Sequence, residues 1–138
     1  MRFIVLVKGS KEAESGKMPD RRDLEAMSKF NEELVDAGLM LGGEGLQPSS
    51  KGSRISFAHG KPTISDGPFA ESKELVAGYW ILQAKSKAEV IEWMKKAPFV
   101  DGEIEIRPIV GDEEFAYAPE VMEHEKKLRA RIAQNQRH

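Results

Sequence analysis

Hydrophobic residues recur along the chain in patterns that predict four main β-strands. Residues 2–8 and 74–84 carry apolar side chains at both odd and even positions. A strand that is apolar on both sides is expected at the centre of a sheet whose two faces are covered. Residues 103–109 alternate between isoleucine and charged residues, which indicates a strand with one buried face. Residues 39–41 begin the remaining strand, which runs into a loop at 42–48.

Two helices are predicted between these strands. Asp20 is a suitable N-cap for the first helix, and Gly38 is a suitable residue to end it. Ser86 and Glu89 form an S-x-x-E capping box that opens the second helix, and Pro98 is expected to end that helix. The apolar residues that recur at helical spacing in the first helix are Leu24, Met27, Phe30, Leu34 and Val35.

The order of these elements predicts a ferredoxin-like α+β fold, βαββαβ, with an inserted hairpin at residues 54–65. In that fold the first and third main strands are central, which agrees with their two apolar faces. Both helices then cover one face of the sheet, and the other face keeps an apolar row. Because an uncovered apolar patch usually marks an association surface, we predict a homodimer with the two sheets packed face to face.

Residues 1–110 are predicted to form this domain, and residues 111–138 a C-terminal loop and helix extension. Pro119 fits the first position of the helix, and acidic residues precede basic ones along it, as the helix dipole favours. The apolar seam of this helix is narrow, so we expect it to dock on the domain or to wrap a dimer. A frayed tail and a partner-binding arm are the alternatives.

Composition narrows the function classes. The chain has 138 residues and a net charge of −2, so it lacks the basic footprint of direct nucleic-acid binding. It has no cysteine, which excludes disulfides and thiolate chemistry. Its longest apolar run, residues 3–7, is too short for a membrane helix, and it begins with no secretory leader. We therefore expect a cytoplasmic protein. The three histidines lie far apart in the sequence and no nucleotide-binding motif occurs, so neither a metal site nor a cofactor is predicted. A carboxylate-only site for a hard cation is the alternative.

Ionisable residues are densest in the stretch DGPFAESKE, residues 66–74. Carboxylates and an ammonium group that converge beside a cleft shift one another's pKa and can act as a general acid–base pair. We therefore predict Asp66, Glu71 and Lys73 as catalytic residues. The alternative is a solvated turn with ordinary ion pairs, each of which contributes little.

Five further residues are predicted to contact a ligand. Tyr79 and Trp80 point to opposite faces of the sheet, and a buried tyrosine hydroxyl needs a partner, which a ligand can supply. Arg107 lies on the polar face of the last strand, where it can receive an anionic group or simply be solvated. The predicted ligand-binding residues are Glu44, Phe69, Glu74, Tyr79 and Arg107.

Four segments of the sequence resemble a known family. Together they are similar to the DGPF-domain subgroup of the YCII-related proteins, and the similarity covers about residues 1–110. The resemblance implies that the ferredoxin-like domain forms a dimeric α+β barrel. The four segments are LMLGGEGLQP (39–48), SDGPFAESKE (65–74), GYWILQA (78–84) and EIEIRPI (103–109).

Two functions of different classes stay open. The candidate residues favour binding of a small organic ligand in a cleft of the dimeric barrel, with or without cofactor-independent acid–base catalysis. The resemblance implies the alternative, a non-catalytic regulatory module associated with an extracytoplasmic-function sigma factor. Elsewhere in the wider superfamily a histidine–aspartate pair is the proposed catalytic apparatus. Met27 stands approximately where that histidine would be, and its helix contains no histidine.

Overall fold

The structure is a computed structural model that describes residues 1–70 and 74–136. Two of the predicted catalytic residues, Glu71 and Lys73, lie outside the described residues. The chain divides into two compact units, Met1–Pro108 and Ile109–His138. Each unit is described by itself.

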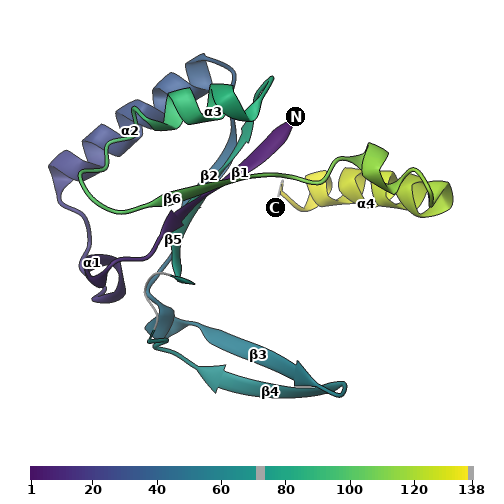
Figure 1. Ribbon diagram of the computed structural model, residues 1–138, viewed down its shortest axis with the longest axis horizontal. Coiled ribbons are helices and arrows are strands. Elements are labelled where there is room, and N and C mark those ends of the chain that lie inside the picture. The colour runs from purple at the N-terminus through teal and green to yellow at the C-terminus, as the bar shows by residue number, and fades with distance from the viewer. Residues whose placement is uncertain (71–73, 137–138) are drawn as a thin grey trace. The chain divides into compact units, whose positions relative to one another are not determined.

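A four-stranded antiparallel sheet forms the centre of the first unit (Figure 1). Its strands are β1 (Arg2–Lys8), β2 (Met40–Gly45), β5 (Val76–Gln83) and β6 (Ile104–Pro108). They lie in the order β2-β5-β1-β6, so the two strands that are apolar on both faces are central. The predicted ferredoxin-like arrangement is therefore confirmed. Strand β2 is longer than the sequence predicted, because its glycine-rich half continues to pair with β5.

Two helices, α2 (Arg21–Asp36) and α3 (Lys87–Met94), pack on one face of this sheet (Figure 1). Both begin at their predicted caps: the Asp20 carboxylate accepts a hydrogen bond from a backbone N–H in the first turn of α2, and Ser86 does the same for α3. Helix α3 ends at Met94, before the predicted stop at Pro98, and Pro98 lies in the turns that follow it.

A short helix, α1 (Lys11–Glu14), lies in the segment 9–19, for which the sequence predicted only a polar loop. The Ser10 hydroxyl accepts a hydrogen bond of 3.1 Å from the N–H of Ala13 and so caps this helix. The sequence does contain a signal for this helix, because a serine that can act as N-cap is followed by a run of good helix formers.

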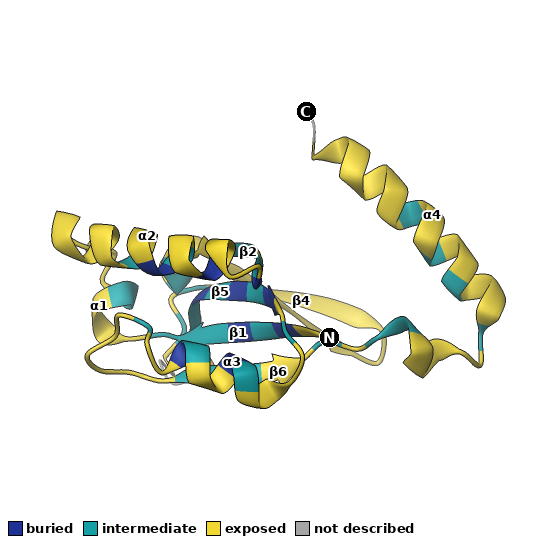
Figure 2. Ribbon diagram, turned by 90° about the horizontal axis from the view of Figure 1, so that it is seen from above, coloured by how far each residue is buried: buried dark blue, intermediate teal, exposed yellow. Residues whose placement is uncertain are grey.

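The core lies between the sheet and the two helices, where the dark residues of Figure 2 gather. The residues with buried side chains in this core are Phe3, Val5, Phe30, Leu34, Leu39, Trp80, Leu82, Val90 and Met94. On the opposite face of the sheet, Ile4 pairs with Ile81 and Leu6 with Tyr79. These four residues are half-buried, so this face carries the apolar row that the sequence predicted.

A hairpin separate from the main sheet follows the short helix η1 (Ser49–Lys51). It consists of β3 (Ser53–Ala58) and β4 (Lys61–Asp66), which pair with each other in a two-stranded sheet. All twelve residues of its strands are exposed.

The hairpin root, formed by Glu14, Ser49, Gly52, Gly67 and Phe69, joins the hairpin to the body of the unit. The Glu14 carboxylate accepts hydrogen bonds from the Ser49 hydroxyl and, at 2.8 Å, from the Ser49 N–H. The N–H of Phe69 donates to the Ser49 hydroxyl oxygen at 3.0 Å, and the N–H of Gly67 donates to the Gly52 carbonyl at 3.0 Å. The root therefore fixes both ends of the hairpin.

Glu14 makes this root sensitive to pH. The two hydrogen bonds from Ser49 lower the pKa of the Glu14 carboxyl below its ordinary value. Its contribution is therefore fully present above the ordinary glutamate pKa of about 4.3 and is lost as the pH falls through the lower folded value. We expect Glu14→Gln to flatten the fall in stability between pH 5 and pH 3, measured by urea unfolding. The exposed neighbour Glu12, replaced in the same way, should leave that fall unchanged.

The second unit contains the helices η3 (Asp112–Phe115) and α4 (Pro119–Asn135). Pro119 is the first residue of α4, as predicted. The Arg129 guanidinium binds the Asp112 carboxylate through two hydrogen bonds of 2.9 and 2.7 Å, so the unit is closed by a bidentate ion pair. Among the residues that the structure describes, no helix is long and apolar enough to cross a membrane.

Candidate functional site

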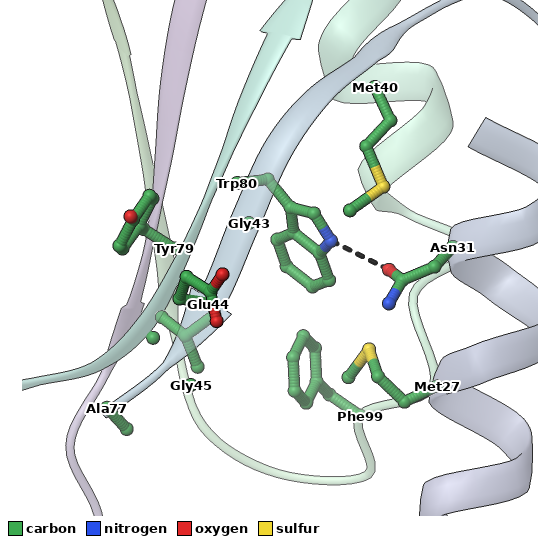
Figure 3. A pocket seen from close by; sticks show the side chains of 12 residues that line it. Met27, Asn31, Met40, Gly43, Glu44, Gly45, Ala77, Tyr79, Trp80 and Phe99 are labelled. Carbon is green, nitrogen blue, oxygen red and sulfur yellow. Dashed lines mark hydrogen bonds between the residues drawn. The ribbon is translucent and has the colours of Figure 1, made fainter. Parts of the chain in front are cut away.

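A pocket of about 340 Å³ lies between α2 and the sheet, and we call it the Trp80 pocket (Figure 3). The side chains of Met27, Asn31, Met40, Trp80 and Phe99 converge on it from α2, two strands and the loop after α3. Its lining consists of Val7, Met27, Asn31, Met40, Gly43, Glu44, Gly45, Ala77, Gly78, Tyr79, Trp80 and Phe99.

Trp80 is the buried wall of this pocket and has only 4% of its surface exposed. Its ring meets Phe30 edge to face at a centroid distance of 5.9 Å, and Phe99 at 6.2 Å. Its indole N–H donates a hydrogen bond of 2.8 Å to the side-chain oxygen of Asn31. Two aromatic neighbours and one hydrogen bond therefore hold the indole in a single orientation.

The glycines of β2 make room for the indole. Gly43 pairs with Trp80 across the two strands. A Cβ atom at Gly43 would lie 3.1 Å from the Trp80 ring and 3.0 Å from the carbonyl oxygen of Tyr79, which is tighter than side chains normally pack. The stretch GGEG, for which the sequence predicted a loop, is thus part of an edge strand whose missing side chains shape the pocket.

Asn31 supplies the polar group of the pocket. Met27 and Asn31 are four residues apart on α2, so both lie on the helix face that meets the sheet. An indole N–H can only donate, and the amide atom that faces it is therefore the oxygen. The amide nitrogen keeps two donor hydrogens for another partner, and Figure 3 shows this nitrogen on the side of Asn31 away from the hydrogen bond.

Glu44 and Tyr79 are the predicted ligand-binding residues that border the pocket. They pair with each other across β2 and β5, and each is one residue away from the neighbouring pair of Gly43 and Trp80. Their side chains therefore belong to the sheet face opposite the helices, and Figure 3 shows the Tyr79 ring on the far side of its strand from Trp80. Tyr79 and Trp80 point to opposite faces, as the sequence predicted.

The DGPF turn holds two predicted residues that are not part of this lining. Asp66 is exposed at the end of β4, where it accepts a hydrogen bond of 2.7 Å from the Ser53 hydroxyl. Phe69 is half-buried, and the Arg54 guanidinium lies 3.9 Å from the centre of its ring. In the described residues, this turn therefore takes part in the contacts of the hairpin root.

The last predicted residues are distributed over other parts of the chain. Arg107 is exposed on β6, 3.9 Å from the carboxylate of Glu105, and Glu74 is exposed just before β5. Glu71 and Lys73 lie outside the described residues, so their predicted roles stay predictions. No group of three or more histidine, aspartate or glutamate side chains is placed to hold a metal ion within residues 1–70 and 74–136.

Three lining residues of the pocket, Asn31, Met40 and Phe99, were not among the site residues predicted from the sequence. One signal indicated Asn31: it lies four residues after Met27, on a helix face where the pattern otherwise places apolar side chains. Phe99 lies in an irregular loop, and no sequence periodicity indicates that it turns toward Trp80.

The fold and the pocket together define a ferredoxin-like α+β domain with an apolar, ligand-sized pocket beneath its first long helix. Comparison with known families identifies this domain more closely. The profile of the YCII-related domain matches residues 1–115. The chain belongs to the YCII-related domain family.

Two individual proteins are similar to this chain. An uncharacterised protein of Rhizobium meliloti (strain 1021) is 27% identical over 96 residues, which cover 67% of this chain and 77% of that protein. A solved structure of 5-chloro-2-hydroxyhydroquinone dehydrochlorinase from Burkholderia phenoliruptrix AC1100, in complex with 2,5-dihydroxybenzoquinone, is 18% identical in sequence. It covers 82% of this chain and 98% of its own, with a TM-score of 0.41.

Proposed function

We propose that this protein binds a small organic molecule with an apolar ring and an oxygen acceptor in the Trp80 pocket. The observation that carries the proposal is an apolar wall with one oriented donor: Asn31 uses its oxygen for Trp80 and keeps its amide nitrogen for a ligand. The volume of about 340 Å³ falls within the range of about 300–1,000 Å³ that is typical of ligand pockets. The thioethers of Met27 and Met40 make favourable contacts with an aromatic ring.

A pair of matched probes tests the donor. Acetophenone and ethylbenzene have similar shapes, and only acetophenone carries a carbonyl acceptor. We expect acetophenone to bind about 2–10 times more tightly, since one hydrogen bond contributes about 0.5–1.5 kcal/mol net. Ligand-observed NMR titration measures both affinities. In Asn31→Leu the preference should disappear, while Asn135→Leu, in the second unit, should keep it. Equal affinities in the unmodified protein, or an unchanged preference in Asn31→Leu, would contradict the proposal.

Acid–base catalysis on the bound ligand would need a carboxylate inside the pocket, and Glu44, the one carboxylate that the described residues contribute to the lining, directs its side chain to the sheet face opposite the helices. Asp66 and Glu71 are the carboxylates predicted to be catalytic, and Lys73 or Arg107 would hold an anionic group of the substrate. The groups that converge inside the pocket are an amide, an indole and two thioethers, which bind a ligand without transferring protons. Binding is therefore the function that the geometry supports best.

A homodimer forms part of this proposal. Ile4, Leu6 and Ile81 lie side by side on the sheet face opposite α2 and α3. A two-fold pair packed through this face would bury all three side chains and would make the dimeric α+β barrel of the DGPF-domain subgroup.

A regulatory role is the second candidate, and the observation that favours it is the surface of α4. No residue of this helix is buried, and Val121 and Ile132 are 53% and 52% exposed. In this candidate function α4 would contact a partner in the cytoplasm, such as an extracytoplasmic-function sigma factor, and the pocket would bind a signal rather than a substrate.

A further inference from the structure

The hairpin of β3 and β4 has one apolar and one polar face. Ile55 pairs with Ile64, and Phe57 pairs with Pro62, so these four side chains lie on the same side of the ribbon. The other side carries only polar or small residues: Arg54, Ser56, Ala58, Lys61, Thr63 and Ser65. A ribbon that stayed in water on both sides would gain nothing from this alternation. The pattern therefore indicates that the apolar face is covered when the protein acts.

Within the described residues of the first unit, that face is exposed. Phe57 is 74% exposed, Ile64 68% and Ile55 57%. A two-stranded hairpin is at best marginally stable alone in water, which adds to the need for a covering surface. At the same time, the contact of Arg54 with Phe69 and the hydrogen bonds of the hairpin root fix the base of the ribbon. The apolar face thus lies on a preorganised hairpin, so less conformational entropy is lost when it binds.

We propose that this hairpin is a dimerisation arm whose apolar face packs on a second copy of the same chain. The proposal rests on the homodimer proposed above and adds a second contact to it. The acceptor surface on the second copy is the edge of the sheet beside the sheet-to-sheet contact: Leu41 in β2 and Leu46 just after it are each 49% exposed there.

The area that a stable dimer needs supports a second copy as the occupant. Strands of five to eight residues give the sheet face opposite α2 and α3 an area of roughly 400 Å². Pairing two such faces therefore buries roughly 800 Å². That value is typical of crystal contacts and falls below the roughly 1,200–2,000 Å² of stable interfaces. Two arms of six-residue strands, counted on both partners, add roughly 800 Å². With the arms the interface reaches the standard size, and two-fold symmetry supplies both arms at once.

Two neighbouring substitutions on the arm test the proposal. Phe57→Glu places a charge on the apolar face, and Ser56→Glu places the same charge on the polar face one residue away. Because both positions are exposed, both variants should keep the far-ultraviolet circular dichroism of the unmodified protein. We expect Phe57→Glu to raise the dimer dissociation constant at least about tenfold, as loss of an aromatic anchor does, and Ser56→Glu to leave it unchanged. Sedimentation equilibrium from 0.1 to 100 µM measures the constant.

Each outcome decides a separate point. If Phe57→Glu does not weaken the dimer, the hairpin is not a dimerisation arm, while the sheet-to-sheet dimer is unaffected. The apolar face of the hairpin then binds a different partner. Equal weakening by both variants also overturns the arm, because the effect would not depend on the apolar face. An unmodified protein that is monomeric throughout this range overturns the homodimer itself. The binding of acetophenone in the Trp80 pocket is measured independently of all three outcomes.

Discussion

Trp80→Ala is expected to lower the free energy of unfolding by about 3–5 kcal/mol, as removal of a buried aromatic side chain typically does. Trp80 is 4% exposed, and its ring contacts both Phe30 and Phe99. The substitution also leaves the side-chain oxygen of Asn31 without the indole N–H, which adds the cost of a partly buried unpaired group. Urea unfolding followed by far-ultraviolet circular dichroism measures the loss without relying on tryptophan fluorescence.

The other tryptophan is the matched control. Trp93 is half-buried at the surface of α3, where the ammonium group of Lys96 lies 4.8 Å from the centre of its ring. We expect Trp93→Ala to cost about 1 kcal/mol, as is usual for a partly exposed position. Indole, added in solution, should restore part of the stability of Trp80→Ala and none of that of Trp93→Ala, because only the first leaves an enclosed apolar cavity. Equal losses for both variants would contradict the central position of Trp80.

The position of Trp80 shows which parts of the fold could be predicted from the sequence. Alternation sorts Phe3 with Val5 on β1 and Trp80 with Leu82 on β5, because successive side chains of a strand point to opposite faces. Since both strands are apolar on both faces, it is the register, Phe3 opposite Leu82 and Val5 opposite Trp80, that brings these four side chains together in the core. The helix caps at Asp20 and Ser86 are equally local signals, since each hydrogen bond spans three residues.

The site was less predictable, because it depends on contacts between distant segments. The ionisable residues of the DGPF stretch indicated catalysis by their density, yet the described part of that stretch contacts the hairpin root. The donor of the pocket is Asn31, whose orientation is set by a residue 49 positions away. Density along a sequence and convergence in space are different properties, and only the first can be read from one chain. The glycines of β2 show the same difference, because their role is to leave space for Trp80.

Gly67→Ala is expected to open the hairpin root. A Cβ atom at Gly67 would lie only 1.8 Å from the carbonyl oxygen of Ser49, and that atom belongs to the backbone and cannot rotate away. Such overpacking costs about 1–3 kcal/mol. The twelve strand residues of the hairpin are exposed and bury little of the core. The clash is therefore relieved by releasing the hairpin, while the four-stranded sheet stays folded.

Amide hydrogen exchange detects this local opening. At 1.4 kcal/mol for each factor of ten, the protection of the Gly67 and Phe69 amides should fall about 5- to 150-fold, while that of Val5 and Leu82 in the sheet stays unchanged. Gly42→Ala is the control, because a Cβ atom there meets nothing within 4 Å. If both glycine variants exchanged alike, the root would not depend on Gly67. If Gly67→Ala lost protection in the sheet as well, hairpin and sheet would unfold together. The expected result would assign the glycine of the DGPF turn a structural role: it fixes the hairpin in the position from which the apolar face is offered to a second chain.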